Sequence, residues 1–191
     1  MARPIVHDQQ VRQRLLSVTA DLVDRDGPSR VTLREVAAAA DTSTTAIYSL
    51  FGGKAQLLTA AVDDGFRSFG ASQREAADEG LLGLGRAYRV WALDHPALYR
   101  LMFSSALAGI VECTPTPDVT SDAMLPLVEA VGMAQAAGQL RTGDTMVIAM
   151  AIWGQVHGLV SLELARMNHP ATDWAGIYES ALNAVARAWA A

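Results

Sequence analysis

The chain has 191 residues, hydrophobic side chains at 51% of its positions and a formal net charge of −5. A chain of this length can bury a substantial core and accommodate a small domain followed by a larger one. The acidic balance excludes strong attraction of the chain as a whole to nucleic acids. The single cysteine, Cys113, excludes an internal disulfide and agrees with a reducing, cytoplasmic location. The N-terminus lacks the apolar segment of a secretion signal.

The first predicted element is a helix near the N-terminus. Its apolar stripe comprises Val11, Leu15, Val18 and Leu22, and the pair Gly27-Pro28 is expected to end it. Residues 32–54 then predict two short helices joined by a tight turn. Thr32 and Glu35 have the spacing of a capping box at the start of the first of these helices, which should end near Ala40. After a turn at residues 41–42, Ser43 is placed as the N-cap of the second helix.

The second short helix has two chemically different faces. Ile47, Leu50 and Phe51 share the face predicted to point inward. The outward face carries Thr44, Thr45, Tyr48 and Ser49. Short hydroxyl side chains can approach base edges or phosphates closely, and a tyrosine can reach a phosphate from the groove wall. The pattern therefore indicates a DNA-reading helix, although any short amphipathic helix in a bundle can show such a split.

This segment resembles the helix-turn-helix of the TetR family of bacterial transcriptional regulators. The positions that match the family pattern are Thr32, Val36, Ala37, Ser43, Ile47, Tyr48, Phe51 and Lys54. Two departures concern the turn and the start of the reading helix. Asp41 stands where most members have glycine, and it can still adopt a left-handed backbone at some cost. Thr45 replaces a frequent glycine, and Thr44 occupies a position where a base-reading arginine is common, which affects the sequence preference rather than the fold.

The resemblance implies a set of DNA-binding residues. They are Thr32, Arg34, Ser43, Thr44, Thr45, Tyr48, Ser49 and Lys54. Lys54 is the only lysine in the chain and matches a phosphate contact of the family, at a helix N-terminus whose field favours an anion. A solvated surface lysine is the alternative. Residues 1–54 hold seven basic and six acidic side chains, so the net charge is +1 there and −6 in the remainder, and we expect a shallow salt dependence of DNA binding.

The rest of the chain predicts further helices and no sheet. They span about 54–72, 81–94, 96–108, 121–138, 143–168 and 172–190, with a proline-containing loop at 112–118. The predicted fold is all-α, with a three-helix helix-turn-helix domain at residues 1–53. Residues 54–191 would form a helical bundle that binds an effector and dimerises.

The predicted helix at 143–168 contains 18 consecutive uncharged residues between Asp144 and Glu163. That length reaches the lower limit for a membrane-spanning helix. Gln155 and His157 lie near its centre, both flanks are acidic, and no basic anchor is present. We therefore expect a helix buried between protein surfaces and no membrane partner.

A helix that is apolar on all sides needs two surfaces to cover it, which indicates a two-fold homodimer built from the last two helices of each chain. TetR-type regulators generally dimerise in this way. The predicted interface comprises Gly154, Gly158, Leu162, Ile177, Ala181, Leu182 and Val185, the two glycines permitting close helix approach. Trp153, His157 and Gly158 resemble the W-H-G signature of one C-terminal ligand-domain subgroup, and residues 88–103 resemble its central helix pair.

The predicted effector pocket lies between the helices at 81–108 and the region 121–157. Its candidate residues are Phe66, Trp91, Met102, Phe103, Leu125, Met146, Met150, Trp153 and His157. Methionine and aromatic side chains form adaptable apolar walls, although at helical spacing they also form ordinary cores. His157 fits either a ligand hydrogen bond or a structural role at the dimer seam. The scarcity of polar candidates favours an unidentified apolar or aromatic effector.

No catalytic or metal-binding pattern is present in the sequence. The four histidines are scattered, and neither a glycine-rich phosphate loop nor a nucleophile elbow occurs. Asp63 and Asp64 are interpreted as a solvated helix face. We therefore expect no enzyme, metal or cofactor, but a ligand-responsive transcriptional regulator. The predicted form is a repressor that a small apolar effector releases from a near-palindromic double-stranded DNA operator. The alternative is a dimeric small-molecule-binding or interaction module without DNA affinity.

Overall fold

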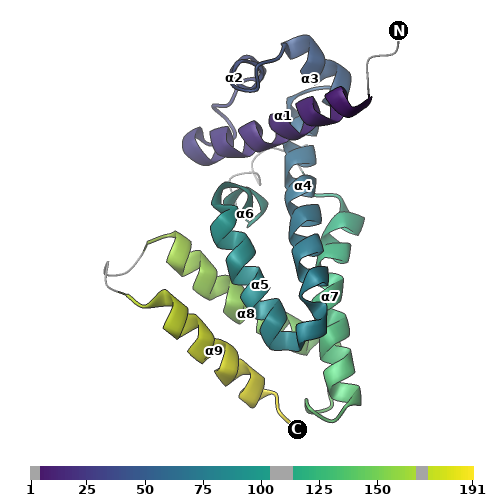
Figure 1. Cartoon of the computed structure of the whole chain (residues 1–191), viewed down its shortest axis with the longest axis vertical. Coiled ribbons are helices and arrows are strands. Elements are labelled where there is room, and N and C mark those ends of the chain that lie inside the picture. The colour runs from purple at the N-terminus through teal and green to yellow at the C-terminus, as the bar shows by residue number, and fades with distance from the viewer. Residues whose placement is uncertain (1–4, 104–113, 167–171) are drawn as a thin grey trace. The chain divides into compact units, whose positions relative to one another are not determined.

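The computed structural model describes residues 5–103, 114–166 and 172–191, and in those ranges the chain is helical with no strand. The helices are α1 (Ile5–Asp26), α2 (Leu33–Ala39), α3 (Thr44–Phe51), α4 (Lys54–Glu75), the 3₁₀ turn η1 (Ala77–Glu79), α5 (Gly80–Asp94), α6 (Pro96–Phe103), α7 (Pro117–Ala136), α8 (Thr145–Leu164) and α9 (Trp174–Ala188) (Figure 1). The predicted all-α fold is confirmed.

The chain divides into two compact units that do not follow the predicted boundary at residue 53. Unit 1 comprises Met1–Arg67 and His95–Thr120, and unit 2 comprises Ser68–Asp94 and Ser121–Ala191. The first part of α4 and the whole of α6 therefore belong with the helix-turn-helix. Arg100 of α6 forms an ion pair with Asp24 of α1, in which Nη2 donates to Oδ2 at 2.7 Å. Helical periodicity does not reveal such a long-range contact, and the functions predicted for 1–53 and 54–191 stay predictions.

The core of unit 1 holds α1, α2, α3 and the first turns of α4 together. Leu15 and Leu16 of α1, Val36 of α2, Ile47 of α3 and Leu57 of α4 are almost completely buried. Burying a leucine or isoleucine side chain contributes roughly 1.5–3 kcal/mol each. Gly27, at a φ of +80°, ends α1 as predicted. The short helices α2 and α3 thus depend on α1 and α4 for their stability.

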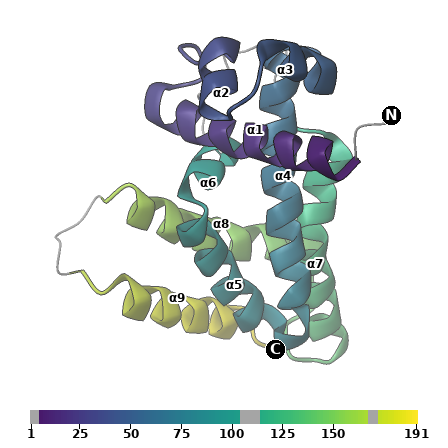
Figure 2. The same ribbon diagram turned by 45° about the horizontal axis from the view of Figure 1, so that its top comes forward.

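Unit 2 is built from the second half of α4 together with α5, most of α7, α8 and α9. Val131 of α7, Ile148 and Ala149 of α8, and Val185 of α9 belong to one apolar cluster. Phe69 of α4 packs edge-on against Tyr88 and Trp91 of α5, with ring centroids 5.2 and 5.4 Å apart. Helices α8 and α9 run side by side (Figure 2). These contacts give α8 one covered face within the chain.

Several helix boundaries differ from the prediction. Helix α4 continues to Glu75 instead of ending near residue 72, and α7 begins at Pro117 instead of residue 121. Proline is favoured at the first helical position because its missing N–H would be unpaired there in any case. Of the helix predicted at 96–108, residues 104–108 lie outside the described ranges, as do 112–113 of the predicted loop and 167–168 of the helix predicted at 143–168.

Helix α8 is long and apolar enough to cross a membrane by length and composition, with a mean hydropathy of 1.5, and 28% of that apolar window is buried in the chain. Length and composition do not distinguish a spanning helix from one covered by protein. Its polar residues have partners inside unit 2, since the Gln155 amide donates to the Ala181 carbonyl at 2.8 Å. The remaining outward face is apolar.

Candidate nucleic-acid interface and effector cavity

Local hydrogen bonds define the start of α2 and the turn after it. The Thr32 hydroxyl accepts from the Glu35 N–H at 3.3 Å, and the Glu35 carboxylate accepts from the Thr32 N–H at 2.9 Å. The predicted capping box is therefore present. The hydrogen bond from the Thr32 side chain lowers the pKa of Glu35. Asp41 has a φ of +50°, so it adopts the left-handed backbone that the turn requires without glycine.

Helix α3 begins and ends with clear capping interactions. Ser43 is its N-cap, as predicted, and its hydroxyl accepts from the Ala46 N–H at 3.1 Å. Gly52, at a φ of +89°, forms the left-handed C-cap. Lys54 follows as the first residue of α4. The two caps define the length of α3, so the direction of its side chains follows directly from the sequence.

Most of the outward face of α3 is exposed, whereas on the inward face Ile47 is buried and Leu50 and Phe51 are half-buried. Ile47 has no exposed surface, whereas Tyr48 is 59% exposed. Thr45 and Ser49 are exposed as well, and Thr44 is half-buried. Helices α2 and α3 lie next to α1 (Figures 1 and 2). This face places an aromatic and several hydroxyl side chains where an external partner can contact them.

The remaining predicted DNA contacts differ in their surroundings. Arg34 is exposed and Lys54 is half-buried. The Thr32 hydroxyl already donates to the Glu35 carboxylate at 2.8 Å, so it is engaged in the cap. Two further basic side chains are held by the protein. Arg12 lies over the Phe51 ring at 4.7 Å, and Arg14 donates to the Ala40 carbonyl at 3.5 Å. These cation contacts position α1 against α2 and α3.

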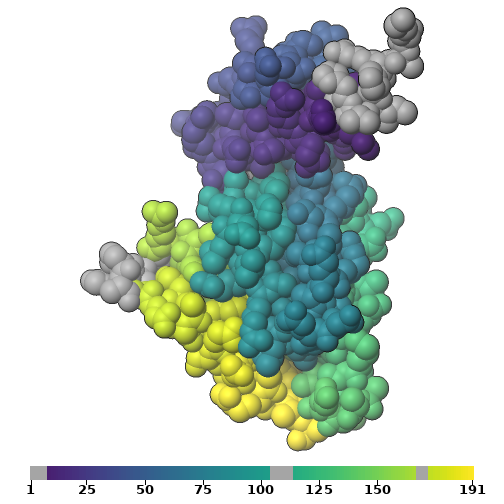
Figure 3. All heavy atoms as spheres, viewed as in Figure 1, coloured from purple at the N-terminus to yellow at the C-terminus, as the bar shows by residue number. Residues whose placement is uncertain are grey.

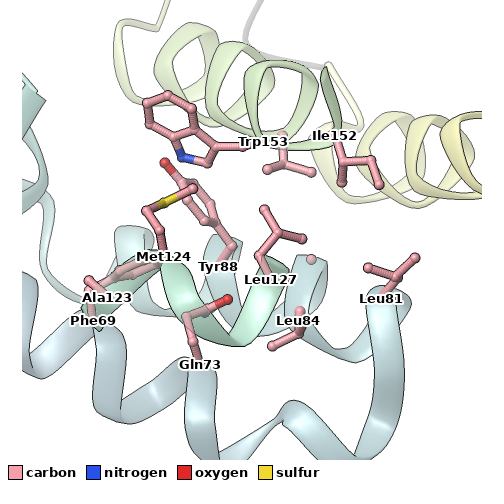
Figure 4. Close-up of a pocket in the computed structure, with 12 residues that line it drawn as sticks. Phe69, Gln73, Leu81, Leu84, Tyr88, Ala123, Met124, Leu127, Ile152 and Trp153 are labelled. Carbon is pink, nitrogen blue, oxygen red and sulfur yellow. The ribbon is translucent and has the colours of Figure 1, made fainter. Parts of the chain in front are cut away.

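Unit 2 encloses a small cavity between α4, α5, α7 and α8 (Figure 4). Its lining residues are Phe69, Gln73, Leu81, Leu84, Gly85, Tyr88, Ala123, Met124, Leu127, Ile152, Trp153 and Val156. The volume is about 20 Å³, enough for about one water molecule. In this described lining no side chain is charged, and Gln73 and Tyr88 supply the polar side-chain oxygen atoms. An ionised ligand would therefore have no oppositely charged side chain beside it in this lining.

Of the nine residues predicted to form the effector pocket, Trp153 lines this cavity. Phe66, Met102 and Phe103 belong to unit 1, where the Phe66 and Phe103 rings meet edge-on at 5.8 Å. Trp91 is buried in unit 2, and its indole N–H donates to the Ser68 hydroxyl at 3.0 Å. Leu125, Met146 and Met150 have exposed side chains and lie outside the lining. The periodicity of the sequence identifies the apolar positions of α7 and α8, but it does not show whether each one faces the cavity, the core or the surface.

Sequence reasoning proposed Phe66 from α4 and missed Phe69 and Gln73, the two α4 residues that line this cavity. Phe69 and Gln73 are one helical turn apart on α4 and both line it. Gln73 is buried; its amide nitrogen donates to the Leu84 carbonyl, and its amide oxygen accepts from the Tyr88 N–H, both at 3.3 Å. A glutamine on the apolar face of a helix is a signal that could have indicated this place.

Several residues of the predicted dimer interface lie at the surface of α8 and α9, and the interface itself stays a prediction. Gly154 and Gly158 have open space where a side chain would be, and Leu162 and Ile177 are exposed. Ala181 is half-buried. Leu182 and Val185, by contrast, are buried inside their own chain, and their prediction as interface residues is corrected. The Leu182 side chain packs on α5 at Gly85, where an added Cβ would lie 2.5 Å from Leu182 Cδ2. Figure 3 shows α9 at the surface of unit 2.

Comparison with family models decides the classification. A model described as "Bacterial regulatory proteins, tetR family" matches residues 15–61, and one described as "Tetracyclin repressor-like, C-terminal domain" matches residues 81–185. The chain belongs to the TetR family. It is accordingly a DNA-binding transcriptional regulator, of a family that is not enzymatic. Membership of the W-H-G subgroup stays a prediction. No curated protein sequence matches the chain.

Solved structures share the fold of this chain. A protein described as regulatory, SCO4313, is 27% identical, with a TM-score of 0.77 over 96% of this chain and 98% of that one. A protein of unknown function from Rhodococcus sp. RHA1 is 26% identical, with a TM-score of 0.79 over 95% and 96% of the two chains. A TetR family transcription regulator from Marinobacter aquaeolei VT8, 20% identical, shares the fold with a TM-score of 0.77 over 96% and 97%.

In this TetR-family regulator, His157 of α8 lies within hydrogen-bond distance of Tyr88, a residue of the cavity wall. Its Nδ1 lies 2.9 Å from the Tyr88 hydroxyl, and its Nε2 lies 3.4 Å from the Ser161 hydroxyl. A neutral ring that accepts from Tyr88 and carries its proton on Nε2 satisfies both contacts. Burial lowers the pKa of His157 from its ordinary value of 6.5. The cavity wall is therefore held by a neutral hydrogen-bonded pair.

This pKa shift predicts a pH dependence of stability. Because the folded pKa of His157 is lowered, the unfolded chain binds its proton first as the pH falls below about 6.5, and the free energy of unfolding decreases there. Above that pH the contribution is fully present. Urea unfolding at pH 7.5 and pH 5.5 of the wild type and His157→Gln should show a smaller loss in the variant. Equal losses in the two proteins would contradict this prediction.

Asp63 is a buried residue that the sequence analysis wrongly interpreted as part of a solvated helix face. It is 6% exposed rather than solvated. Its carboxylate accepts from the Thr116 N–H at 2.9 Å and from the Thr116 hydroxyl at 2.6 Å. The neighbouring Asp64 is half-buried and accepts from the Gln13 amide at 2.8 Å. The sequence did not reveal these contacts, because Thr116 and Gln13 are distant in sequence from the two carboxylates.

Proposed function

We propose that this protein is a cytoplasmic, dimeric repressor that leaves a near-palindromic operator when a small, neutral, mainly apolar molecule occupies the cavity of unit 2. The exposed hydroxyl-bearing face of the doubly capped α3 is the observation that carries the DNA-binding part. Such side chains can donate hydrogen bonds to phosphate oxygens, and they can donate to or accept from base edges. Ser43, Thr44, Thr45, Tyr48 and Ser49 supply this surface, with Arg34 and Lys54 beside it in the chain.

The exposed apolar faces of α8 and α9 support the dimer. Val147, Met150, Gly154 and Leu162 lie on the uncovered side of α8, and Ile177 on that of α9. Monomeric soluble proteins rarely expose large contiguous apolar patches. A second copy related by a two-fold axis would cover both helices in an isologous four-helix contact. It would also present two α3 helices for successive major grooves, about 34–36 Å apart.

The lining of the cavity supports a neutral effector. Burying a charged group against uncharged walls is costly, so a charged molecule is disfavoured. The volume of about 20 Å³ means that a ligand must displace side chains. Met124, a flexible side chain in the wall, provides one such adjustment. A ligand oxygen placed near Tyr88 would compete for the hydrogen bond between Tyr88 and His157.

Release requires a difference in ligand affinity between two conformations. Shifting operator occupancy from about 99:1 to 1:99 needs a preference of about 5.5 kcal/mol. The same coupling makes bound DNA weaken ligand binding by an equal factor. In a ligand-released repressor, bound DNA therefore weakens ligand binding, whereas in a passive ligand carrier it does not.

The experiment starts from the unmodified full-length protein and a random-sequence DNA pool. We expect the selected DNA to be a near-palindrome whose half-sites are one helical turn apart. Neutral apolar compounds and charged metabolites are then compared by thermal shift and by release of the selected DNA. Stabilisation and release by neutral compounds support the proposal, whereas stabilisation by charged metabolites alone contradicts the effector class.

A ligand-binding or interaction module without DNA affinity is the second candidate. The net charge of −5 favours it, since phosphate attraction supplies most non-specific affinity for DNA. Electrophoretic mobility shift at low and moderate salt separates the two functions. Selection that enriches no sequence, together with no retarded band, would favour the module.

A further inference from the structure

Helices α4 and α7 both pass from unit 1 into unit 2. The change of unit falls between Arg67 and Ser68 in α4 and between Thr120 and Ser121 in α7. Each helix continues without a break across this point. A movement that starts in unit 2 can therefore reach unit 1 along either helix, and the contacts between the two helices decide how they respond.

In unit 1 the two helices are joined by the buried carboxylate of Asp63. It receives both the backbone N–H and the hydroxyl of Thr116, the residue directly before α7. Arg67, one turn further along α4, lies 3.8 Å from the same carboxylate. Hydrogen bonds to an ionised group are stronger than neutral ones, and a buried carboxylate that loses them is costly. We call this Asp63–Thr116 contact the clamp.

In unit 2 the same helices touch at Gly70 of α4 and Ala123 of α7. A Cβ at position 70 would lie 3.1 Å from the Cα of Ala123, so the absence of a side chain permits this approach. The cavity begins at this contact. Phe69 and Gln73 line it from α4, and Ala123 and Met124 line it from α7. A guest that widens the cavity therefore pushes α4 and α7 apart close to Gly70.

We propose that the clamp is the coupling element that turns this separation into a movement of α4, and hence of its DNA-side end at Lys54. The inference rests on the proposed function and names how that cavity is linked to DNA binding. While Asp63 holds the start of α7, α7 cannot shift away from α4 as a whole, and widening at Gly70 must tilt or bend α4. Without the clamp, α7 can shift away from α4 by itself, and α4 keeps its position. Asp63 and Thr116 are thus positioning residues.

The test uses a wedge in place of an unidentified ligand. Gly70→Ala adds one methyl group against the Ala123 backbone and forces the two helices apart at the cavity edge. Thr116→Val removes the clamp hydroxyl while keeping the shape of the side chain and its backbone N–H. Thr120→Val is the matched control, because that hydroxyl bonds only locally, to the Pro117 carbonyl at 2.8 Å, among the contacts that the structure describes.

Affinity for the selected DNA is measured by fluorescence anisotropy for the wild type, each single variant and each pair with Gly70→Ala. We expect Gly70→Ala to weaken binding at least about fivefold in the wild type and with Thr120→Val, the lower range of usual allosteric coupling. With Thr116→Val the same wedge should weaken it less than about twofold. A clamp that merely stabilises the fold would leave the effect of the wedge unchanged.

Equal effects of the wedge with and without Thr116→Val would overturn the inference, as would a wedge without effect in the wild type. Circular dichroism at each step verifies folding, and Ala123→Val replaces Gly70→Ala as the wedge if the latter does not fold. A wild-type protein that binds no selected DNA refutes the proposed function and the inference together. Binding by the wild type with equal wedge effects refutes the clamp alone.

Discussion

Replacing Gly154 with glutamate should convert the protein to monomers and weaken operator binding at least about a hundredfold. The chain leaves open space at this position, since a Cβ added there would have no atom of another part of the described chain within 4 Å. Replacing a glycine inside a helix with another residue also stabilises the helix, by up to about 1 kcal/mol. The proposed two-fold seam would nevertheless bring two carboxylates into an apolar contact, which is strongly unfavourable.

The loss of DNA affinity follows from the loss of the second half-site. Linking two binding modules raises the apparent affinity by about 10²–10⁴. Sedimentation velocity and fluorescence anisotropy measure the two effects on the same samples. Val90→Glu is the control, because Val90 is an exposed apolar residue on α5, outside the proposed seam. A Gly154→Glu protein that remains dimeric would place the interface elsewhere.

Tyr48→Ala should weaken binding of the selected operator by about tenfold or more without changing the free energy of unfolding. Tyr48 is 59% exposed, whereas its neighbour Ile47 is fully buried and anchors α3. Removing an exposed ring leaves the packing of unit 1 intact, so any lost affinity is a lost DNA contact. Anisotropy titration measures the first quantity and urea unfolding the second.

Lys54→Ala provides the matched comparison within the same interface. A phosphate contact carries no sequence information, so this variant should weaken binding to all DNA sequences similarly. With one lysine per subunit, the slope of log affinity against log salt should fall by about two in a dimer. Tyr48→Ala should lower the slope less. Unchanged affinity in both variants would refute the assignment of this face to DNA.

The helix-turn-helix could be predicted residue by residue because its determinants are local. The Thr32 and Glu35 capping box, the left-handed Asp41 and the Ser43 cap each involve residues within a few positions of one another. The hydrogen-bonding needs of helix ends are the same in every protein. These signals place α2 and α3 and thereby direct the side chains of the candidate DNA interface.

The cavity and the seam could be predicted only in outline. Periodicity in α9 indicates an apolar stripe, yet Leu182 and Ile177 look alike in sequence while the first is buried and the second is exposed. Leu182 is buried because it packs against α5 at Gly85. Whether an apolar residue is buried depends on the segment that packs against it, and that segment is distant in the chain.

The amino-acid sequence by itself determined the helical class, the limits of α2 and α3 and which side chains α3 turns outward, because caps, turns and helical periods act over a few residues. The tertiary structure decided which face of each later helix is covered, which side chains line the cavity, and that Asp63 is a buried partner of Thr116. Those properties depend on packing between segments far apart in sequence, where many apolar pairings have similar energies until the whole core is assembled.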